Sequence, residues 1–137
     1  LKSLQRVISG ADFRRNDEAW IIADVDEWSD DEFRSLSSWV RRDSRNNVAM
    51  SNPKFELFLI MHYDSADGCT TAQRVDEELA HVMPGYAKRL NRTQFSLEQV
   101  RRAVDCARVK RRTCDEEFPA VGLTDVYVLV EHLLALA

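Results

Sequence analysis

Two aspartates, Asp24 and Asp26, end an apolar run and are the residues whose type and spacing best suit chemistry. The run reads AWIIADV over residues 19–25, and its continuous apolar character is typical of a strand covered on both faces. In a regular strand, residues i and i+2 project from one face. We therefore expect both carboxylates to overhang the carboxyl end of this strand, where open α/β sheets hold ligands. Such a pair suits Mg²⁺, which takes one or two acids together with water and phosphate oxygens. The alternative is an acidic turn that only leads into the next helix.

Glu56 and His62 lie on a second stretch, residues 53–63, which is apolar on nearly every side and is predicted to be a largely buried helix. Pro53 suits the first position of this helix, and Asn52 before it is biased toward extended backbone. A buried carboxylate at Glu56 needs a partner, either the N–H groups of the helix start or a cation. Glu56 is thus a structural anchor or part of a site, and His62 is a hydrogen-bonded core residue or a ligand.

The elements that must position these residues follow from hydrophobic periodicity and capping patterns. Ser29 with Glu32, and Ser96 with Gln99, form capping boxes that predict helix starts. Helices are predicted over about 30–43, 71–82, 97–111 and 124–136, a short buried strand over 47–50, and the end of a further helix over 1–9.

Strand, helix, strand and helix in this order indicate an α/β fold with a parallel sheet. The 137 residues predict one domain, with a sheet-bearing core over about residues 1–64 and a helical C-terminal part over about residues 70–137. Two parallel strands alone make a poor sheet, because independent stability usually takes three or more. We therefore expect further strands from a part of the protein that precedes Leu1.

Charge is unevenly distributed along the chain, whose formal net charge is −4. Residues 84–112 carry nine lysines and arginines against two acids, while the segments on both sides are acidic. Such a basic block indicates a polyanionic partner such as nucleic acid, or only a solvated helix face. The candidate nucleic-acid contacts in the block are Lys88, Arg101, Arg108, Lys110, Arg111 and Arg112.

Several classes of protein are disfavoured by what the sequence lacks. Three cysteines without CxxC spacing argue against a disulfide framework or a zinc site, and favour the reducing cytosol. No stretch reaches the ~18 apolar residues of a membrane span, so we expect no membrane partner. Neither a Ser/His/Asp arrangement nor a glycine-rich phosphate loop can be assembled from the chain.

The two motifs together resemble the RloB-like proteins, which are bacterial proteins linked to restriction and abortive-infection loci and assigned to the Toprim fold. The family pattern is a hydrophobic strand ending in DxD, followed by a helix and a strand that runs into SNPxFExWLxxHF. Residues 51–63 read SNPKFELFLIMHY, with Phe58 in place of tryptophan and Tyr63 in place of phenylalanine. Both positions stay aromatic, and the similarity covers most of the chain.

The resemblance implies a Toprim metal site, in which a glutamate at the end of the first strand works with the DxD around Mg²⁺ in phosphodiester cleavage or formation. Asp24 and Asp26 match the DxD, whereas the glutamate has no counterpart, and its strand is expected before Leu1. The implied activity is that of a Mg²⁺-dependent nuclease in phage defence. Glu56 and His62 would then shape the site, and nucleic acid would be the partner.

Two other functions are also compatible with the sequence. A catalytically degenerate Toprim-like domain would serve as a sensor or scaffold for an ATPase partner of the AAA or ABC type. A phosphotransferase would use Asp24 as its nucleophile, but Trp28 stands two residues after Asp26, where that class of site has threonine or valine.

Overall fold

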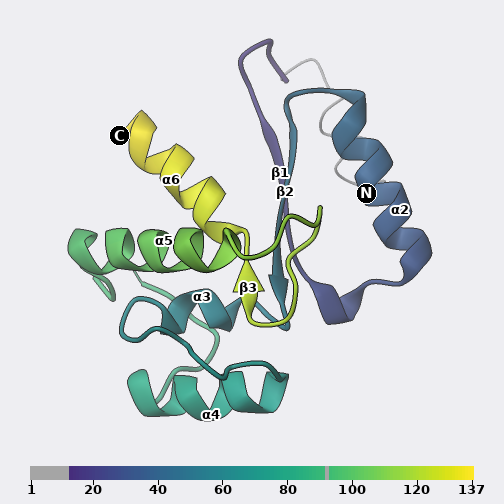
Figure 1. Ribbon diagram of the computed structural model, residues 1–137. Helices are drawn as coiled ribbons and strands as arrows, with labels where there is room; N and C mark the ends of the chain where they lie inside the picture. Colours follow the sequence, from purple (N-terminus) through teal and green to yellow (C-terminus); the bar gives the residue numbers. More distant parts are fainter. Residues whose placement is uncertain (1–12, 92) are drawn as a thin grey trace.

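The computed structural model describes residues 13–91 and 93–137, which form an α/β arrangement as predicted (Figure 1). The helix predicted for residues 1–9 lies outside the described residues. In chain order the elements are β1 (Ala19–Asp24), the 3₁₀ turn η1 (Val25–Glu27), α2 (Asp30–Arg42), β2 (Asn46–Asn52), α3 (Glu56–Ile60), α4 (Ala72–Val82), α5 (Leu97–Arg111), β3 (Leu123–Thr124) and α6 (Val126–Leu136).

The sheet formed by the described residues has the order β1-β2-β3 and is mixed. Strands β1 and β2 are parallel and pair from Ala19 opposite Asn46 to Asp24 opposite Ser51. Strand β3 runs antiparallel to β2, with Thr124 opposite Ser51. The expectation of a purely parallel sheet is therefore wrong. A strand of two residues carries no alternation that sequence reasoning can detect, and it forms here because β2 offers it a partner.

Helices cover the two faces of the sheet unequally (Figure 1). On one face α2 packs Leu36 and Trp39 against Met50 of β2. On the other face, Ala49 of β2 joins a larger core built from α3, α4, α5 and the start of α6. Side chains of β2 thus alternate between two apolar cores, which explains why its central residues are apolar without interruption.

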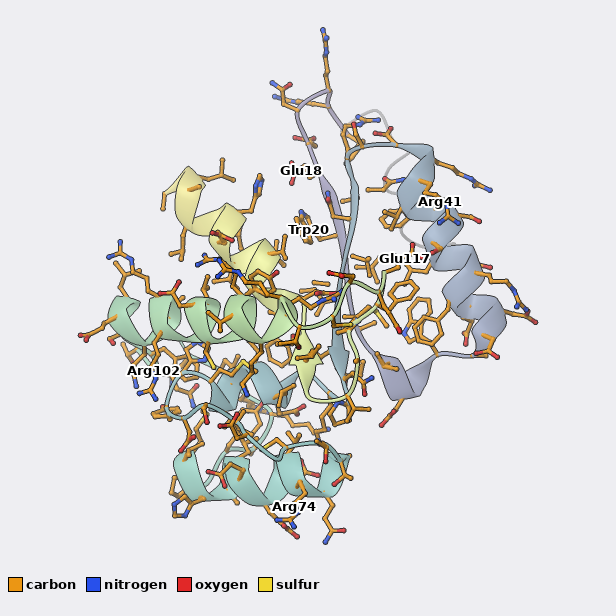
Figure 2. All side chains as sticks on the ribbon, in the orientation of Figure 1. Glu18, Trp20, Arg41, Arg74, Arg102 and Glu117 are labelled. Atoms are coloured by element: carbon orange, nitrogen blue, oxygen red, sulfur yellow. The ribbon has the colours of Figure 1, made fainter. Side chains whose placement is uncertain are left out.

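A loop from the C-terminal half crosses to the far layer and packs on α2. Phe118 lies with its ring centroid 5.0 Å from that of Phe33. Glu117 accepts a hydrogen bond from the hydroxyl of Ser37 and pairs with Arg41, 3.6 Å away (Figure 2). The C-terminal part of the single predicted domain therefore also contacts the α2 layer of the sheet-bearing part.

Helix boundaries agree with the predictions where a cap defines them. Helices α2 and α5 begin at the two predicted capping boxes, and Thr71 caps α4 by accepting from the N–H of Arg74. Helix α3 is shorter than the predicted range of 53–63, because tight i+3 hydrogen bonds flank it on both sides, from Leu57 N–H to Lys54 O and from Tyr63 N–H to Ile60 O.

The last helix begins later than predicted. Thr124 belongs to β3, and the next N–H, that of Asp125, donates to Met50 O of β2 at 2.7 Å, so α6 starts at Val126. None of the helices formed by the described residues is both long and apolar enough to cross a bilayer.

Beyond its first turn, α6 stands partly clear of the sheet (Figure 1). A cavity of about 700 Å³ lies between it and the start of β1, lined mainly by apolar residues that include Trp20 and Leu133. Glu18 and Trp20 of this strand start face the helix (Figure 2), and His132 Nε2 lies 3.1 Å from a Glu18 carboxylate oxygen.

Candidate functional site

Three polar residues form one row across the carboxyl end of β1 and β2. Asp24, Ser51 and Thr124 stand opposite one another on β1, β2 and β3. Ser51 and Thr124 are buried, and their hydroxyl oxygens are 2.7 Å apart. Paired positions on neighbouring strands project their side chains to one face, so the strand-end acid stands beside a polar, hydrogen-bonded row.

The polar residues that open the SNPKFE motif hold the C-terminal loop. Asn52 donates through its side-chain amide to Pro119 O at 3.1 Å, and its own carbonyl accepts from Gly122 N–H at 2.8 Å. Together with the hydroxyl pair, these bonds fasten β3 to β2. Ser51 and Asn52 therefore build the frame of the site.

The carboxylate of Asp24 reaches from β1 to the start of the neighbouring helix. Its Oδ1 accepts the backbone N–H of Phe55 at 2.7 Å. An acid in this position stabilises the N–H groups that the first helical turn leaves unsatisfied. Asp24 thus lies at the strand end, beside α3, as predicted.

Asp26 has a different environment from Asp24. Strand β1 ends at Asp24, and residues Val25–Glu27 form the turn η1, in which Asp26 is exposed. The predicted strand over residues 19–25 is one residue too long, because Val25 already belongs to the turn η1. The expectation that it is covered on both faces is also wrong, because β1 is an edge strand of the sheet formed by the described residues and Ile22 is 51% exposed. Asp26 lies outside the strand, so strand geometry does not place its carboxylate on the same face as that of Asp24.

The donor set fits Mg²⁺ only in part. Asp24 and Asp26 supply two carboxylates near a strand end, and Mg²⁺ is commonly held by one or two acids plus water and phosphate oxygens. Among residues 13–91 and 93–137, no group of three or more His, Cys, Asp or Glu side chains is arranged to hold a metal ion. A third protein ligand is thus not offered by the described residues.

Lys54 lies among the acids of this region, and the sequence does not predict a role for it. Its Nζ binds Asp76 Oδ1 of α4 at 2.5 Å, and its side chain is largely buried. Burial opposes its ionisation, but the bond to Asp76 and the charges of Glu56, Asp76 and Asp24 raise the pKa of Lys54 above its ordinary value. The lysine is therefore a fixed positive charge shared by three carboxylates.

Glu56, in the first turn of α3, is only 7% exposed. No side chain or backbone N–H in the described residues forms a hydrogen bond or an ion pair with its carboxylate, which lines a cavity shared with α4. At the helix start it is Asp24, from another strand, that accepts the N–H of Phe55. Glu56 is a buried carboxylate whose nearest fixed cation, Lys54, is bonded elsewhere.

His62 belongs to the core. Its Nδ1 lies 3.0 Å from Phe58 O and 3.2 Å from Leu59 O, and its ring lies between Phe58 and Phe95. Burial lowers the pKa of His62, although the two carbonyls oppose this effect. The contacts of His62 are thus those of a hydrogen-bonded core residue.

The basic block divides into paired and exposed residues. Arg108 binds Glu131 at 2.5 Å and Asp105 at 2.7 Å, and Lys110 binds Asp67. Arg111 is held most firmly, as its Nε donates to Asp125 Oδ1 at 2.7 Å and its other nitrogens donate to the carbonyls of Cys114 and Glu116. The exposed candidates are Lys88, Arg101 and Arg112.

Comparisons with known proteins give one match. The family model described as RloB-like protein matches residues 1–133. Searches of curated proteins and of solved structures return no match to the chain.

Proposed function

We propose, from the premise that the chain belongs to the RloB-like protein family, that it acts as a Mg²⁺-dependent nuclease on DNA or RNA in bacterial phage defence. One observation carries the proposal. Asp24 stands at the carboxyl end of β1, and its carboxylate accepts the N–H of Phe55 just before α3, the helix that begins at Glu56. Carboxyl ends of strands in open α/β sheets are where such folds bind ligands.

In this proposal Asp24 and Asp26 hold the metal ion, with Asp24 fixed by its bond to Phe55. A bound Mg²⁺ would supply charge to polarise the scissile phosphate and to activate water. Lys54, which lies among three carboxylates, would offset part of the negative charge of the same phosphate. His62 keeps a packing role, because its ring lies in the aromatic core.

Backbone contacts to nucleic acid would come from the exposed basic residues. Lys88, Arg101 and Arg112 are exposed, and such contacts give affinity that falls with salt and depends little on sequence. Arg108, Lys110 and Arg111 would contribute less, because each already neutralises an acid of the chain.

The test is cleavage of single- and double-stranded DNA and RNA with Mg²⁺ by the wild type, Asp24→Asn and Asp26→Asn. We expect either substitution to abolish cleavage, with Asp30→Asn, an exposed acid at the start of α2, as the matched control. Cleavage that survives both substitutions contradicts the proposed role of the pair.

A second candidate is a catalytically degenerate domain that serves as a sensor or scaffold for an ATPase partner of the AAA or ABC type. It is favoured by the same described residues, in which no three-ligand group can hold a metal ion. Calorimetric titration with Mg²⁺ separates the two candidates. Binding lost in Asp24→Asn supports the nuclease, and no binding to the wild type supports the scaffold.

A further inference from the structure

A small cavity lies beside the strand-end acids, between α3, α4 and the turn that follows α4. It has a volume of about 250 Å³. This is below the roughly 300–1,000 Å³ of sites for drug-sized ligands, so it suits a single ring system. The lining residues on which the inference depends are Glu56, Asp76, Leu79, Met83, Tyr86 and Lys88.

The Glu56 carboxylate determines what the cavity can bind. The residue is more than nine-tenths buried and lines the cavity. No hydrogen bond from the described residues reaches its carboxylate, and no fully buried side-chain oxygen among them lacks a partner, so the carboxylate keeps its solvent contact at the cavity. An ionised carboxylate only accepts hydrogen bonds, so its partner must bring N–H or O–H donors or positive charge. A carboxylate that meets solvent at a cavity can exchange its water for the donors of a ligand.

A metal ion is the less suitable occupant. Asp76 is the other carboxylate of the lining, and its Oδ1 is bonded to Lys54. The described residues provide no third ligand. A partner with directional N–H donors fits Glu56 better than a cation that needs several oxygens.

The remaining walls suit a flat, weakly polar ring. Leu79 and Met83 are buried apolar residues, and Tyr86 is half-buried. Burial and the charge of Glu56 raise the pKa of Tyr86, so its hydroxyl stays protonated at neutral pH. Lys88 is exposed at the edge of the cavity, where it can meet a phosphate attached to the ring.

We propose that this cavity binds an unpaired guanine base of a single-stranded nucleic acid, with its Watson–Crick edge on Glu56 and its phosphate toward Lys88. Guanine presents two adjacent N–H donors that match both oxygens of a carboxylate. Adenine and cytosine place a ring-nitrogen acceptor beside their single amino group, and the second oxygen would repel it. Proteins commonly read unpaired bases through this edge and by stacking on aromatic side chains.

The inference rests on the proposed function in taking nucleic acid as the source of the base, but binding can be measured without cleavage. The experiment is calorimetric titration of the protein with guanosine, inosine and adenosine 5′-monophosphates in EDTA. Glu56→Gln is compared with Glu77→Gln, an exposed acid of α4 outside the lining.

We expect guanosine monophosphate to bind more tightly than the other two nucleotides, and Glu56→Gln to weaken it about 10- to 100-fold, as for loss of hydrogen bonds to a charged group. Inosine monophosphate, which lacks the 2-amino group, should bind about tenfold more weakly than guanosine monophosphate. This comparison uses the wild type alone, so it holds even if Glu56→Gln fails to fold.

Equal affinity for the three nucleotides, or no binding, overturns the inference. So does stronger binding of N-acetyl-argininamide than of guanosine monophosphate, because the occupant would then be a basic peptide side chain. Cleavage that depends on Asp24 without guanine binding refutes this inference alone. Guanine binding without cleavage refutes the proposed nuclease alone.

Discussion

Two largely enclosed carboxylates, Asp125 and Glu56, follow neighbouring strands of the sheet and differ in how they are satisfied. Asp125 follows β3 and accepts from Arg111 Nε at 2.7 Å, while the same guanidinium donates to the carbonyls of Cys114 and Glu116. Glu56 lies after β2, is less exposed than Asp125, and lines a cavity without a hydrogen-bond donor from the described residues.

The difference separates a structural charge from a candidate binding charge. A buried ion pair with complete hydrogen bonding fixes local geometry, here the joining of α5 to the loop before β3 and to α6. A carboxylate that no protein donor satisfies, and that opens to a cavity, can accept hydrogen bonds from a ligand. Buried charge by itself therefore does not mark a site, and the missing partner is the informative feature.

The largest effect is expected from Arg111→Met, which removes the partner of Asp125. Breaking a buried pair leaves an uncompensated charge, so the free energy of unfolding should fall by about 3–5 kcal/mol. Urea denaturation measures the change, with Arg112→Met, an exposed neighbour, as the control. A loss no larger than that of the control would show that the pair contributes little.

The pH dependence of this variant provides a second check. Burial already raises the pKa of Asp125, and the Arg111 bond opposes this increase. Without Arg111 the native state binds a proton at Asp125 at a pH where the unfolded chain does not, so stability rises as pH falls. The difference in unfolding free energy between Arg111→Met and wild type should therefore shrink from pH 7 to pH 5.

Local chemistry explains which parts of the fold could be predicted. The starts of α2 and α5 depend on Ser29 and Ser96, whose caps lie within four residues and are visible in sequence. Strand β3 depends on β2, more than 70 residues away, as the Ser51 and Thr124 pair illustrates. A strand of two residues has no hydrophobic alternation, so the sequence could not predict this pairing.

The residues of the candidate site also differ in whether the sequence predicts their contacts. The position of Asp24 can be predicted from the apolar run before it, because the end of such a run indicates the end of a strand. The pairing of Lys54 with Asp76 requires α3 to pack on α4, and that of Arg111 with Asp125 requires α5 to meet the start of α6. The charge of Arg111 is visible in the sequence but its partner is not, which is why the sequence predicts a contact with nucleic acid there.

A smaller effect is expected from His62, a buried titratable group that is neutral in the core. Burial lowers its pKa, so the unfolded chain takes up a proton below about pH 6.5 while the native protein does not. The contribution of His62 to the free energy of unfolding is therefore present above that pH. It is lost as the pH falls toward the lowered pKa of His62 in the native state.

Urea denaturation at pH 7.5 and 5.5 tests this dependence in the wild type and in His62→Asn. The asparagine amide can still donate to the carbonyls of Phe58 and Leu59, and the variant should lose less stability between the two pH values than the wild type. His81→Asn, on the exposed side of α4, controls for the loss of a histidine. Equal losses in wild type and His62→Asn would contradict a buried neutral histidine.

The smallest effect on stability, and the opposite sign, is expected at Glu56. Glu56→Gln removes a buried charge that has no hydrogen-bond partner, so the free energy of unfolding should stay unchanged or rise by about 0.5–1 kcal/mol. Lys54 limits the gain, because it loses one of its three neighbouring acids but keeps Asp76. Urea denaturation without nucleotide measures the change, and Glu77→Gln is the matched control. A loss above about 2 kcal/mol, the size expected for breaking a buried charged bond, would make Glu56 a structural residue like Asp125 and remove the contrast between the two carboxylates.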